Sequence, residues 1–461
     1  MDYNNPVIAK KGTDHGDPAV LKFKGVYYLY HTGPRKVPVY RSFNLVDWEE
    51  AGVALWASDD RNHWAQIDLW APEVLCSNGI FYMYVTGATR SGDGTADDEN
   101  RRIGVAKSAS PTGPFILADE PLTREWSIDA HPFQDDDGTF YMYYNVRNDL
   151  TRGPGGIIGT GNVVDRMKDL ETLDGKPAMV VRPEHAWEGN KEGTFFWNEG
   201  PFVLKHLGRY YQMYSAGYFG DDSYGMYYAT SDEPMGEQGM KDTSWKKWQG
   251  GKAILKSNEF CEGPGHHVVT KGPDGVNDYY IYHGYSPDEG VQERRVRVGL
   301  FEWQDDHIWL EPPSDNRLPF PATPSVDARF MSSLKDINRL LSEKKTDDFY
   351  FETTATFLDK CAKMGVSLSD NIRWTIYSEG HRLVAAVENP SQTQCSDLPQ
   401  HVDFTFPQRI SLLKKGGRYT FSINGLEVLT VETGEKYKGE KVLMEYDEGQ
   451  VRAEGTILTT L

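Results

Sequence analysis

Cysteine is scarce in this sequence, which excludes two classes of small scaffold. The 461 residues contain four cysteines, far apart in the chain: Cys76, Cys261, Cys361 and Cys395. This spacing fits neither a disulfide framework nor a CxxC zinc site. We therefore expect a fold held by hydrophobic cores, in a chain long enough for two or three domains.

Long hydrophobic runs are also missing. No apolar stretch approaches the length of a transmembrane helix, and the opening MDYNNPVIAKKGTDHGDP has no signal-peptide core. Together with the scattered cysteines, this predicts a reduced, cytoplasmic setting. A chain whose leader had been removed would read the same way.

Basic residues are too few to balance the acidic ones. Lys and Arg number 49 against 68 Asp and Glu, which gives a formal net charge of −19. A chain this acidic repels phosphate backbones and anionic lipids. Nucleic acid and membrane surfaces are therefore not expected as partners.

Aromatic residues and glycine, in contrast, are abundant. Aromatics make up 13% of the chain, with 26 Tyr and 12 Trp, and there are 45 glycines. This composition is typical of short strands joined by tight turns, and it provides flat apolar faces on which sugar rings stack.

A short motif recurs five times along the first two thirds of the chain. Each copy is a turn residue followed by an aromatic strand: GVYYLYH at Gly25, GIFYMYV at Gly79, GTFYMYY at Gly138, GRYYQMY at Gly208 and NDYYIYHG at Asn277. Four copies follow a segment that opens with a proline: Pro18, Pro72, Pro132 and Pro201. Each unit therefore predicts a hairpin whose first strand starts at a proline, where a missing N–H does least harm.

A third element follows the hairpin in several copies. The segments IGVAKSASPTGPF (103–115) and MYYATSDEPMGE (226–237) match each other, and VYRSFNLVDW (39–48) is a looser version. Each repeat thus predicts a sheet of about four strands, and five such sheets arranged radially form a five-bladed β-propeller. The alternative is a β-sandwich with chance similarity, which five copies in one internal order disfavour.

The predicted propeller brings distant residues together. The innermost strand of each sheet lines the central channel, so the starts of the first strands should meet in one funnel. These starts hold Asp17, Trp70, Asp129, Glu199 and His266. Carboxylates gathered in an apolar funnel must shift their pKa values or hold a cation, and both are marks of an active site.

Each of these residues also has a structural explanation when it is taken alone. Asp17 before a proline is often only a turn residue, Glu199 could be a strand-end salt-bridge partner, and His266 could be a core histidine. Their shared place in the repeat favours the functional interpretation over these alternatives.

At these residues the chain resembles glycoside hydrolase family 43, the five-bladed propeller glycosidases. The resemblance spans about residues 10 to 310. It rests on several motifs in the family's order: DPAVLKFKGVYYLYHT, WAPEV, IGVAKSASPTGPF, SIDAHPFQDDDGTFYMYY, NEGPFVLKHLGRYYQMYS and GPGHHVV.

The resemblance implies roles for the matching positions. Asp17 matches the general base, Glu199 the general acid, and Asp129 the carboxylate that orients the acid and tunes its pKa. His266 matches a histidine on the channel axis that helps to hold a hydrated calcium ion, and no organic cofactor is expected. Other matching positions face the sugar: Trp70, Ala71, Ile128 and an arginine among Arg294, Arg295 and Arg297, of which we favour Arg294.

The chemistry is also predicted from the residue types themselves. Breaking a glycosidic bond needs an acid for the departing oxygen and a carboxylate that acts at the anomeric carbon, and their pKa values must differ. Asp129 near Glu199 would keep that residue protonated by like-charge repulsion, which leaves Asp17 ionised as the base. The long segment 147–196 adds aromatics that either shape the substrate rim or pack in the core: Trp187, Phe195, Phe196 and the following Trp197.

The rest of the chain predicts a second domain. The proline-rich segment 311–325 reads as a linker that divides residues 1–322 from residues 323–461. Residues 333–344 have helical spacing, and the alternating segments FYFETTATF, VSLSDNIRWTIYS, RLVAAVEN, HVDFTFP and RYTFSINGLEVLTVE predict an antiparallel β-sandwich of jelly-roll type. Such a domain either binds sugar or braces the propeller, and we favour bracing.

The resulting hypothesis is an all-β, inverting glycoside hydrolase with a carbohydrate substrate. It would release L-arabinofuranose or D-xylose from plant cell-wall oligo- and polysaccharides. Two alternatives stay open: the same fold acting on galactofuranose or galactose, and a non-catalytic carbohydrate-binding propeller. A lectin would not need three carboxylates in one funnel and usually repeats its site in every blade.

Overall fold

The computed structural model describes residues 2–236, 243–287, 293–314, 316–368, 372–379, 382–388, 393–399, 401–432, 439 and 441–461. Within these residues the protein is all-β, with one α-helix, α1 (Leu334–Ser342), and four 3₁₀ segments, Asp149–Thr151, Pro154–Gly156, Ala186–Glu188 and Trp248–Gly250. None of the described helices has the length and apolar character needed to cross a membrane. The four cysteines, all within the described residues, are unpaired.

Five antiparallel sheets follow one another along residues 19–310. The first contains β2 (Ala19–Phe23), β3 (Val26–Tyr30), β4 (Lys36–Ser42) and β5 (Glu49–Trp56). The second contains β6 (Ile67–Ser77), β7 (Ile80–Arg90), β8 (Ala96–Ser108) and β9 (Ile116–Leu117). The third contains β10 (Ser127–Gln134), β11 (Phe140–Val146), β12 (Gly161–Asp169), β13 (Thr172–Leu173) and β14 (Ala178–Val181). The fourth contains β15 (Asn198–His206), β16 (Arg209–Ala216), β17 (Gly225–Ser231), β18 (Lys246–Lys247) and β19 (Leu255–Lys256). The fifth contains β20 (Glu262–Lys271), β21 (Asp278–Tyr285), β22 (Arg295–Gln304) and β23 (His307–Leu310).

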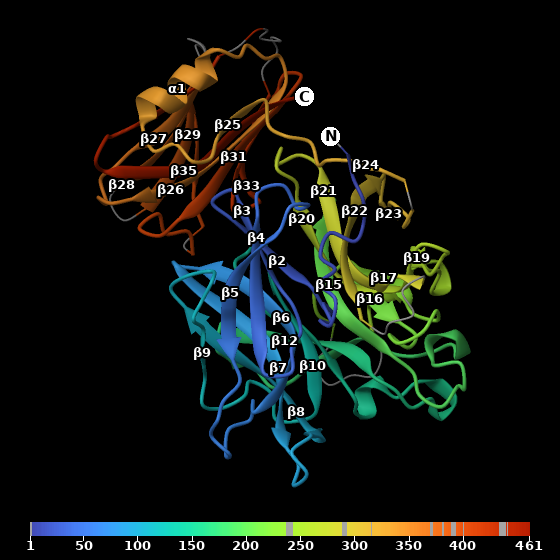
Figure 1. Cartoon of the computed structure of the whole chain (residues 1–461). Helices are drawn as coiled ribbons and strands as arrows, with labels where there is room; N and C mark the ends of the chain where they lie inside the picture. Colours follow the sequence, from blue (N-terminus) through green and yellow to red (C-terminus); the bar gives the residue numbers. More distant parts are fainter. Residues whose placement is uncertain are drawn as a thin grey trace.

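The five sheets close into a ring. Their first strands contact one another in the order β2, β6, β10, β15 and β20, and β20 returns to β2. Each of five hydrophobic cores is shared by two neighbouring sheets, and the one that closes the ring contains Tyr27, Leu29, Ile281 and Val296. The first strands therefore converge, as the repeats predict, and Figure 1 shows these sheets in blue through yellow.

The five predicted aromatic hairpins are confirmed. β2 pairs with β3, β6 with β7, β10 with β11, β15 with β16, and β20 with β21. The four turn glycines have φ between 72° and 86°: Gly25, Gly79, Gly138 and Gly208. This left-handed conformation costs other residues about 1–2 kcal/mol, which explains the glycine in the motif.

The predicted start at Pro18 is confirmed to within one residue, since β2 begins at Ala19, but the starts at Pro72, Pro132 and Pro201 are wrong by several residues. Strand β6 begins at Ile67, and Pro72 lies inside it, where the pairing register shifts between Trp70 and Glu73. A bulge leaves backbone N–H groups outside the ladder, so a proline is tolerated there. Strands β10 and β15 also contain a proline at or next to a register shift.

Two further sheets and α1 form from residues 326–460. One sheet has the order β25 (Val326–Ala328), β35 (Val451–Thr460), β26 (Phe349–Phe357), β31 (Gln408–Lys415), β32 (Arg418–Ile423) and β33 (Leu426–Glu432). The other has the order β30 (Thr393–Asp397), β29 (Arg382–Glu388), β28 (Ile372–Glu379), β27 (Met364–Leu368) and β34 (Val442–Tyr446). A single hydrophobic core joins them, and Phe351, Trp374 and Phe421 lie in it.

Most elements predicted for this region are confirmed. The helix begins after Ser333, whose Oγ accepts the N–H of Asp336, and β32 and β33 meet at the predicted Asn424–Gly425 turn. The strand predicted at residues 401–407 is wrong, because that segment is a turn. Its Phe404 is buried against Phe357, so its alternating aromatics reflect one core contact and not a strand.

The predicted linker lies against the ring. Within it, β24 (Leu318–Pro319) pairs with β1 (Asp2–Tyr3), and Phe320 packs edge-on against Tyr3. Residue 315 of the linker lies outside the described residues.

Ion pairs join the C-terminal sheets to the ring. Lys22 on β2 lies 3.1 Å from Glu352 on β26, and both side chains are almost fully buried. The hydroxyl of Tyr350 also donates to Glu352, at 2.7 Å. A second pair, Lys24 with Glu454 at 2.6 Å, is partly exposed. In Figure 1 the C-terminal sheets, in orange and red, lie beside β2, β3 and β4.

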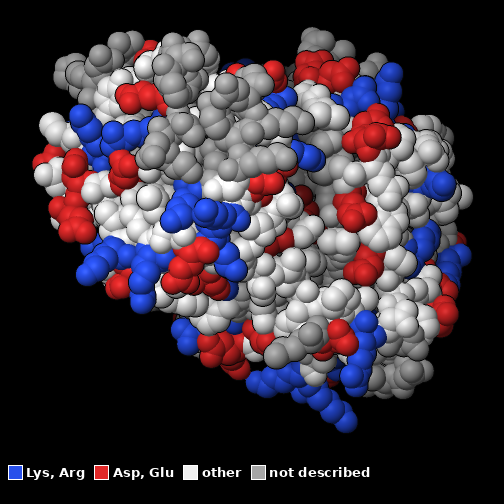
Figure 2. All heavy atoms as spheres, turned by 90° about the horizontal axis from the view of Figure 1, so that it is seen from above, with Lys and Arg blue, Asp and Glu red and all other residues white. Residues whose placement is uncertain are grey.

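Acidic and basic side chains are mixed on the face of the molecule seen in Figure 2, where they lie among neutral residues. The expectation that phosphate-rich partners are disfavoured rests on the net charge of −19 and stays a prediction.

The buried ion pair predicts a difference in stability between two lysine variants. Lys22→Met should lower the free energy of unfolding by about 3 kcal/mol, because it leaves Glu352 as a buried charge without its nearest cation. Lys24→Met, its matched control, should cost less than about 1 kcal/mol, because that pair is partly exposed. Urea unfolding followed by tryptophan fluorescence measures both. Equal effects of the two substitutions would contradict the importance of the buried pair.

Candidate active site

A cavity of about 350 Å³ lies where the inner strands converge. Its walls include three carboxylates, Asp17, Asp129 and Glu199, together with His266 and Arg294. A larger cavity, of about 660 Å³, is lined by residues near 121–127 and 168–177 and contains none of the predicted site residues. We take the smaller cavity as the candidate site because three largely buried carboxylates from three different sheet regions of the ring come together in it.

Every sheet of the ring has a left-handed residue at a corresponding position of its inner strand region. The φ angles there are 55°, 43°, 58°, 56° and 41°, for Asp17, Ala71, Asp129, Gly200 and His266. Four of the five are not glycine, and the left-handed conformation is strained for such residues. The structure thereby corrects the predicted equivalence of five strand starts, because Trp70 and Glu199 each lie one residue before this position.

Side chains of the preceding sheet hold these positions through hydrogen bonds. The N–H of Ala71 donates to Thr32 Oγ1 at 3.0 Å, that of Asp129 to Thr86 Oγ1 at 3.2 Å, that of His266 to Ser215 Oγ at 2.8 Å, and that of Asp17 to His283 Nδ1 at 3.0 Å. In the fourth sheet, Asn145 Nδ2 donates to the carbonyl of Asn198 at 2.5 Å. We call the five holding residues the inter-sheet ring: Thr32, Thr86, Asn145, Ser215 and His283. Hydrogen bonds between neighbouring sheets therefore stabilise the inner strand regions that contain the left-handed residues.

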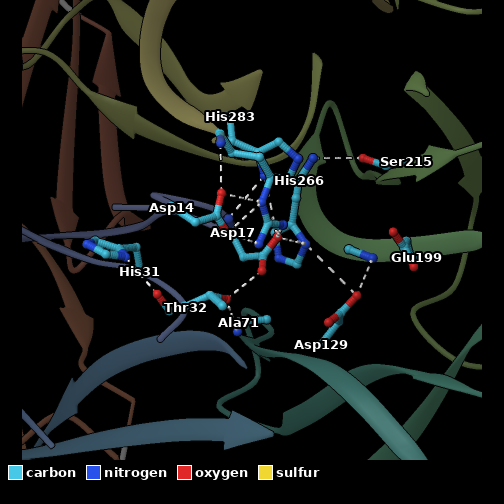
Figure 3. Close-up of polar contacts among 12 residues, drawn as sticks. Asp14, Asp17, His31, Thr32, Ala71, Asp129, Glu199, Ser215, His266 and His283 are labelled. Carbon is cyan, nitrogen blue, oxygen red and sulfur yellow. Dashed lines mark hydrogen bonds and ion pairs between the residues drawn. The ribbon is translucent and has the colours of Figure 1, made fainter. Parts of the chain in front are cut away.

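Asp17 is held as a carboxylate by cationic and polar neighbours (Figure 3). Arg294 Nη1 donates to its Oδ1 at 2.8 Å, and Thr32 Oγ1 donates to its Oδ2 at 2.5 Å. Burial alone would raise the pKa of Asp17, but Arg294, His266 and His283 hold it well below the ordinary value of 3.8. Asp17 is therefore ionised at neutral pH.

Glu199 and Asp129 have the opposite environment. Burial raises the pKa of Glu199 to about 7, against a hydrogen bond of 2.8 Å that the Tyr224 hydroxyl donates to its Oε1. Burial also raises the pKa of Asp129 to about 7, with a further contribution from Glu199. Repulsion by Asp129 was the predicted cause for Glu199, but burial is the largest one, and the like charge that adds to it is Asp17. Both carboxyl groups are therefore protonatable near neutral pH.

The backbone brings this pair together. The N–H of Gly200, the residue after Glu199, donates to Asp129 Oδ2 at 3.1 Å. Asp129 thus contacts the strand that carries Glu199, and His266 Nδ1 lies 3.9 Å from the same Asp129 oxygen and 3.3 Å from Asp17 Oδ1.

Most predicted sugar-facing residues line the cavity. Trp70, Ile128 and Arg294 do so, and the guanidinium of Arg101 lies 3.5 Å from the centre of the Trp70 ring. Ala71 is buried outside the lining, where it bonds to Thr32.

The other candidates from the sequence are divided between the cavity and the core. Arg295 and Arg297 do not line the cavity. Arg295 donates hydrogen bonds to the carbonyl of Thr13 and to Glu293, and Arg297 donates one to Ser286. Among the aromatics of segment 147–196, Phe195 and Trp197 line the cavity, whereas Trp187 stacks on Tyr227. Phe196 packs against the backbone at Gly159 and Gly189.

The predicted calcium ion has no protein cage among the described residues. No group of three or more His, Cys, Asp or Glu side chains there is arranged to hold a metal ion. His266 could therefore supply one ligand at most, and water would have to supply the rest of the six to eight that calcium prefers. The ion stays a prediction, and no step proposed below uses it.

Several residues at the site were missed from the sequence. Trp126, Arg147, Asp98 and Phe219 also line the cavity, and the Arg147 guanidinium lies 4.7 Å from the centre of the Trp126 ring. Asp14 binds Arg294 through three hydrogen bonds to its side chain. A signal for the inter-sheet ring was present, because a polar residue lies seven positions after each turn glycine: Thr32, Thr86, Asn145 and Ser215.

Comparison with known proteins identifies the family of the chain. The family model "Glycosyl hydrolases family 43" matches residues 3–309. The "Beta-D-galactofuranosidase xynD" of Aspergillus niger is 34% identical over 311 residues, which cover 61% of this chain and 77% of that protein. The "Xylosidase/arabinosidase" of Bacteroides ovatus is 30% identical over 285 residues, or 52% and 82% of the two chains.

Solved structures agree with this match. A thermostable family-43 glycoside hydrolase is 37% identical, with a TM-score of 0.60 over 70% of this chain and 99% of its own. The GH43 BlXynB protein from Bacillus licheniformis is 16% identical and shows the fold alone, with a TM-score of 0.53 over 100% of both chains. These neighbours are β-propellers, with which the ring of sheets agrees.

Glycoside hydrolases need a protonated carboxyl group and an ionised carboxylate in one cavity. This cavity holds one ionised carboxylate and two protonatable ones. The chain belongs to glycosyl hydrolase family 43. Its substrate is a carbohydrate.

The hydrogen bond from Tyr224 predicts a shift in the pKa of Glu199. Because the phenol donates to the carboxylate, Tyr224→Phe should raise that pKa further above its ordinary range. Carbon-13 NMR of glutamate carboxyl groups measures it, with Glu199→Gln to assign the signal. Tyr228→Phe on β17 is the matched control, since Tyr228 packs in a hydrophobic core and should leave the titration unchanged. An unchanged or lower pKa in Tyr224→Phe would contradict the direction of this hydrogen bond.

Proposed function

We propose that this enzyme is an inverting, exo-acting glycosidase that releases L-arabinofuranose or D-xylose from plant cell-wall oligo- and polysaccharides. The observation that carries the proposal is the separation of protonation states in one cavity. Arg294 keeps Asp17 ionised, while burial keeps Glu199 and Asp129 protonatable near neutral pH.

Glu199 is the general acid in this proposal. A carboxyl group with a pKa of about 7 carries its proton at neutral and lower pH and can give it to the departing glycosidic oxygen. The bond between Tyr224 and Glu199 Oε1 leaves Oε2 as the oxygen that carries this proton toward the substrate.

Asp129 is the residue that tunes and orients the acid. It is buried, it accepts the N–H of Gly200, and its charge and that of Glu199 raise each other's cost of ionisation. After Glu199 has given its proton to the substrate, two carboxylates lie close together, and this favours the return of a proton to one of them.

Asp17 is the general base. It accepts a proton from a water molecule as that water attacks the anomeric carbon, on the face opposite the leaving group. Asp17 precedes the first sheet and Glu199 lies on the fourth, and these two sheets are not neighbours in the ring. This placement supports room for a water molecule between the base and the sugar.

The cavity supports removal of one terminal sugar at a time. At about 350 Å³ it is near the lower end of ligand cavities, roughly 300–1,000 Å³. Trp70 and Ile128 offer apolar faces to the ring, and Arg294 offers donors to its hydroxyl groups.

For the architecture we propose a five-bladed propeller over residues 1–322 and a jelly-roll sandwich over residues 323–461. Five sheets in a closed ring and two sheets around one core support this division. The buried contact of Lys22 with Glu352 supports a bracing role for the sandwich.

Galactofuranose is the second candidate sugar. A relative with 34% identity is described as a β-D-galactofuranosidase, and another with 30% identity as a xylosidase/arabinosidase. All three sugars present a ring that one shallow cavity accepts, so the aromatic rim decides among them.

A panel of 4-nitrophenyl glycosides tests the substrate. The proposal expects the highest kcat/KM on α-L-arabinofuranoside or β-D-xyloside. A highest value on β-D-galactofuranoside would shift the assignment to the second candidate. Silence on the whole panel and on oligosaccharides, with sugar binding retained, would favour the non-catalytic propeller.

The acid assignment predicts a dependence on the leaving group. Glu199→Gln should lose about 10²–10⁴-fold in kcat on oligosaccharides but less on activated aryl glycosides, which need little protonation. In the wild type, kcat/KM on oligosaccharides should fall as the pH rises through about 7, because Glu199 then loses its proton.

This fall should disappear in Glu199→Gln, whose amide does not titrate. The matched control is Glu302→Gln, an exposed residue on β22 outside the cavity. Equal losses on the two kinds of substrate would overturn the assignment of Glu199.

A further inference from the structure

Thr32 connects the backbone of one sheet to a carboxylate of another. The residue follows β3 in the first sheet and is nearly buried. Its Oγ1 accepts the N–H of Ala71 at 3.0 Å and lies 2.5 Å from Asp17 Oδ2. A continuous chain of hydrogen bonds therefore runs from Ala71 through Thr32 to Asp17, as Figure 3 shows.

The direction of this chain is fixed by its first member. A backbone N–H can only donate, so the Thr32 oxygen accepts from Ala71 and its single hydrogen is free to point to Asp17. Asp17 is ionised through Arg294 and accepts it. Hydrogen bonds to a charged acceptor are shorter and stronger than neutral ones, in agreement with the short contact here.

Thr32 differs from the other members of the inter-sheet ring. All five hold the backbone of a neighbouring sheet, and among the described hydroxyl members, Thr32, Thr86 and Ser215, it is Thr32 whose hydroxyl donates to a carboxylate. His283 holds Asp17 from the opposite side, by accepting its backbone N–H. Backbone and side chain of Asp17 are thus fixed from two different sheets.

The two oxygens of Asp17 have different neighbours. Oδ1 receives Arg294 at 2.8 Å and has His266 Nδ1 at 3.3 Å and His283 Nδ1 at 3.4 Å. Oδ2 accepts one hydrogen bond among the described residues, from the hydroxyl of Thr32. A carboxylate oxygen has about two lone-pair sites, so Oδ2 keeps one for a water molecule.

We propose that Thr32 is a positioning residue that turns Asp17 so that Oδ2 is the oxygen that takes the proton from the attacking water. The proposal rests on the assignment of Asp17 as the general base. Removal of the hydroxyl would let the carboxylate rotate about its remaining bond to Arg294, and a misplacement of about 1 Å can cost about 100-fold in rate.

Other charged and titratable groups face Asp17, and they also influence its pKa. Among the described residues these groups include Asp14, Asp129, Glu199, Tyr224, His266, His283, Tyr285 and Arg294. Because Arg294 stays in place when Thr32 is changed, Asp17 should remain ionised at neutral pH. The loss of one donor should still move its titration to higher pH.

Two substitutions at Thr32 separate its hydroxyl from its shape. Thr32→Val keeps the branched side chain without the donor, and Thr32→Ser keeps the donor. On the best aryl glycoside, Thr32→Val should lower kcat about 10- to 100-fold with little change in KM, and move the acidic limb of kcat/KM to higher pH. Thr32→Ser should restore kcat to within about threefold of the wild type.

The matched control is Thr86→Val. It removes the equivalent inter-sheet hydrogen bond, from the N–H of Asp129, without removing a donor to Asp17. This variant should leave the acidic limb where it is in the wild type. If Thr32→Val changed only thermal stability, with kcat and the acidic limb unchanged, Thr32 would be purely structural and the proposal would be wrong.

Neutron diffraction of the wild type tests the same proposal without a variant or a substrate. It should place a deuterium on Thr32 Oγ1 along the line to Asp17 Oδ2, with Asp17 unprotonated. A deuterium on Asp17, or a Thr32 hydroxyl that points elsewhere, would overturn the proposal. Because this measurement needs no activity, a failure of the glycosidase assignment can be told apart from a failure of Thr32.

Discussion

The contact of Arg294 with Asp14 and Asp17 is the interaction on which both the ring and the site depend. Arg294 directly precedes β22 in the fifth sheet, and both aspartates precede β2 in the first. Its guanidinium donates to Asp14 at 2.7 Å and to Asp17 at 2.8 Å and is almost fully buried. One side chain thus ties the end of the ring to its beginning and also fixes the charge of the proposed base.

The position of Arg294 gives different pKa values to three carboxylates that are otherwise alike. Asp17, Asp129 and Glu199 are all largely buried, and burial alone would raise the pKa of each. Arg294 contacts Asp17 and lowers the pKa of that carboxyl group. Glu199 instead accepts a hydrogen bond from a neutral phenol, and Asp129 accepts one from a backbone N–H. An acid and a base can therefore coexist in one cavity at one pH, as glycosidic cleavage requires.

The sequence predicted the aromatic hairpins and the convergence of their first strands, because both follow from a repeated pattern. It also predicted that Asp17, Asp129, Glu199, His266 and Arg294 lie together. The equivalence of Trp70 and Glu199 with the other strand starts was wrong by one residue, since left-handed φ angles and bulges leave little trace in a pattern of residue types.

Other features could not be predicted because they depend on packing between distant segments. The dominance of burial over repulsion at Glu199 is one example, since burial is a property of the assembled cavity. The turn at residues 401–407 is another, because the contact between Phe357 and Phe404 gives it the aromatic pattern of a strand. The role of Thr32 was hidden for the same reason, although its place seven residues after Gly25 repeats in three other copies.

The stereochemistry of the product tests the central claim most directly. If Asp17 activates water while Glu199 protonates the leaving group, the anomeric configuration inverts, which needs roughly 6.5–9.5 Å between the two carboxylates. Proton NMR during early turnover, before the released sugar mutarotates, reports the first anomer. The account predicts a first product of configuration opposite to that of the substrate. A first product that keeps the substrate's configuration would contradict it and indicate a covalent intermediate on a carboxylate.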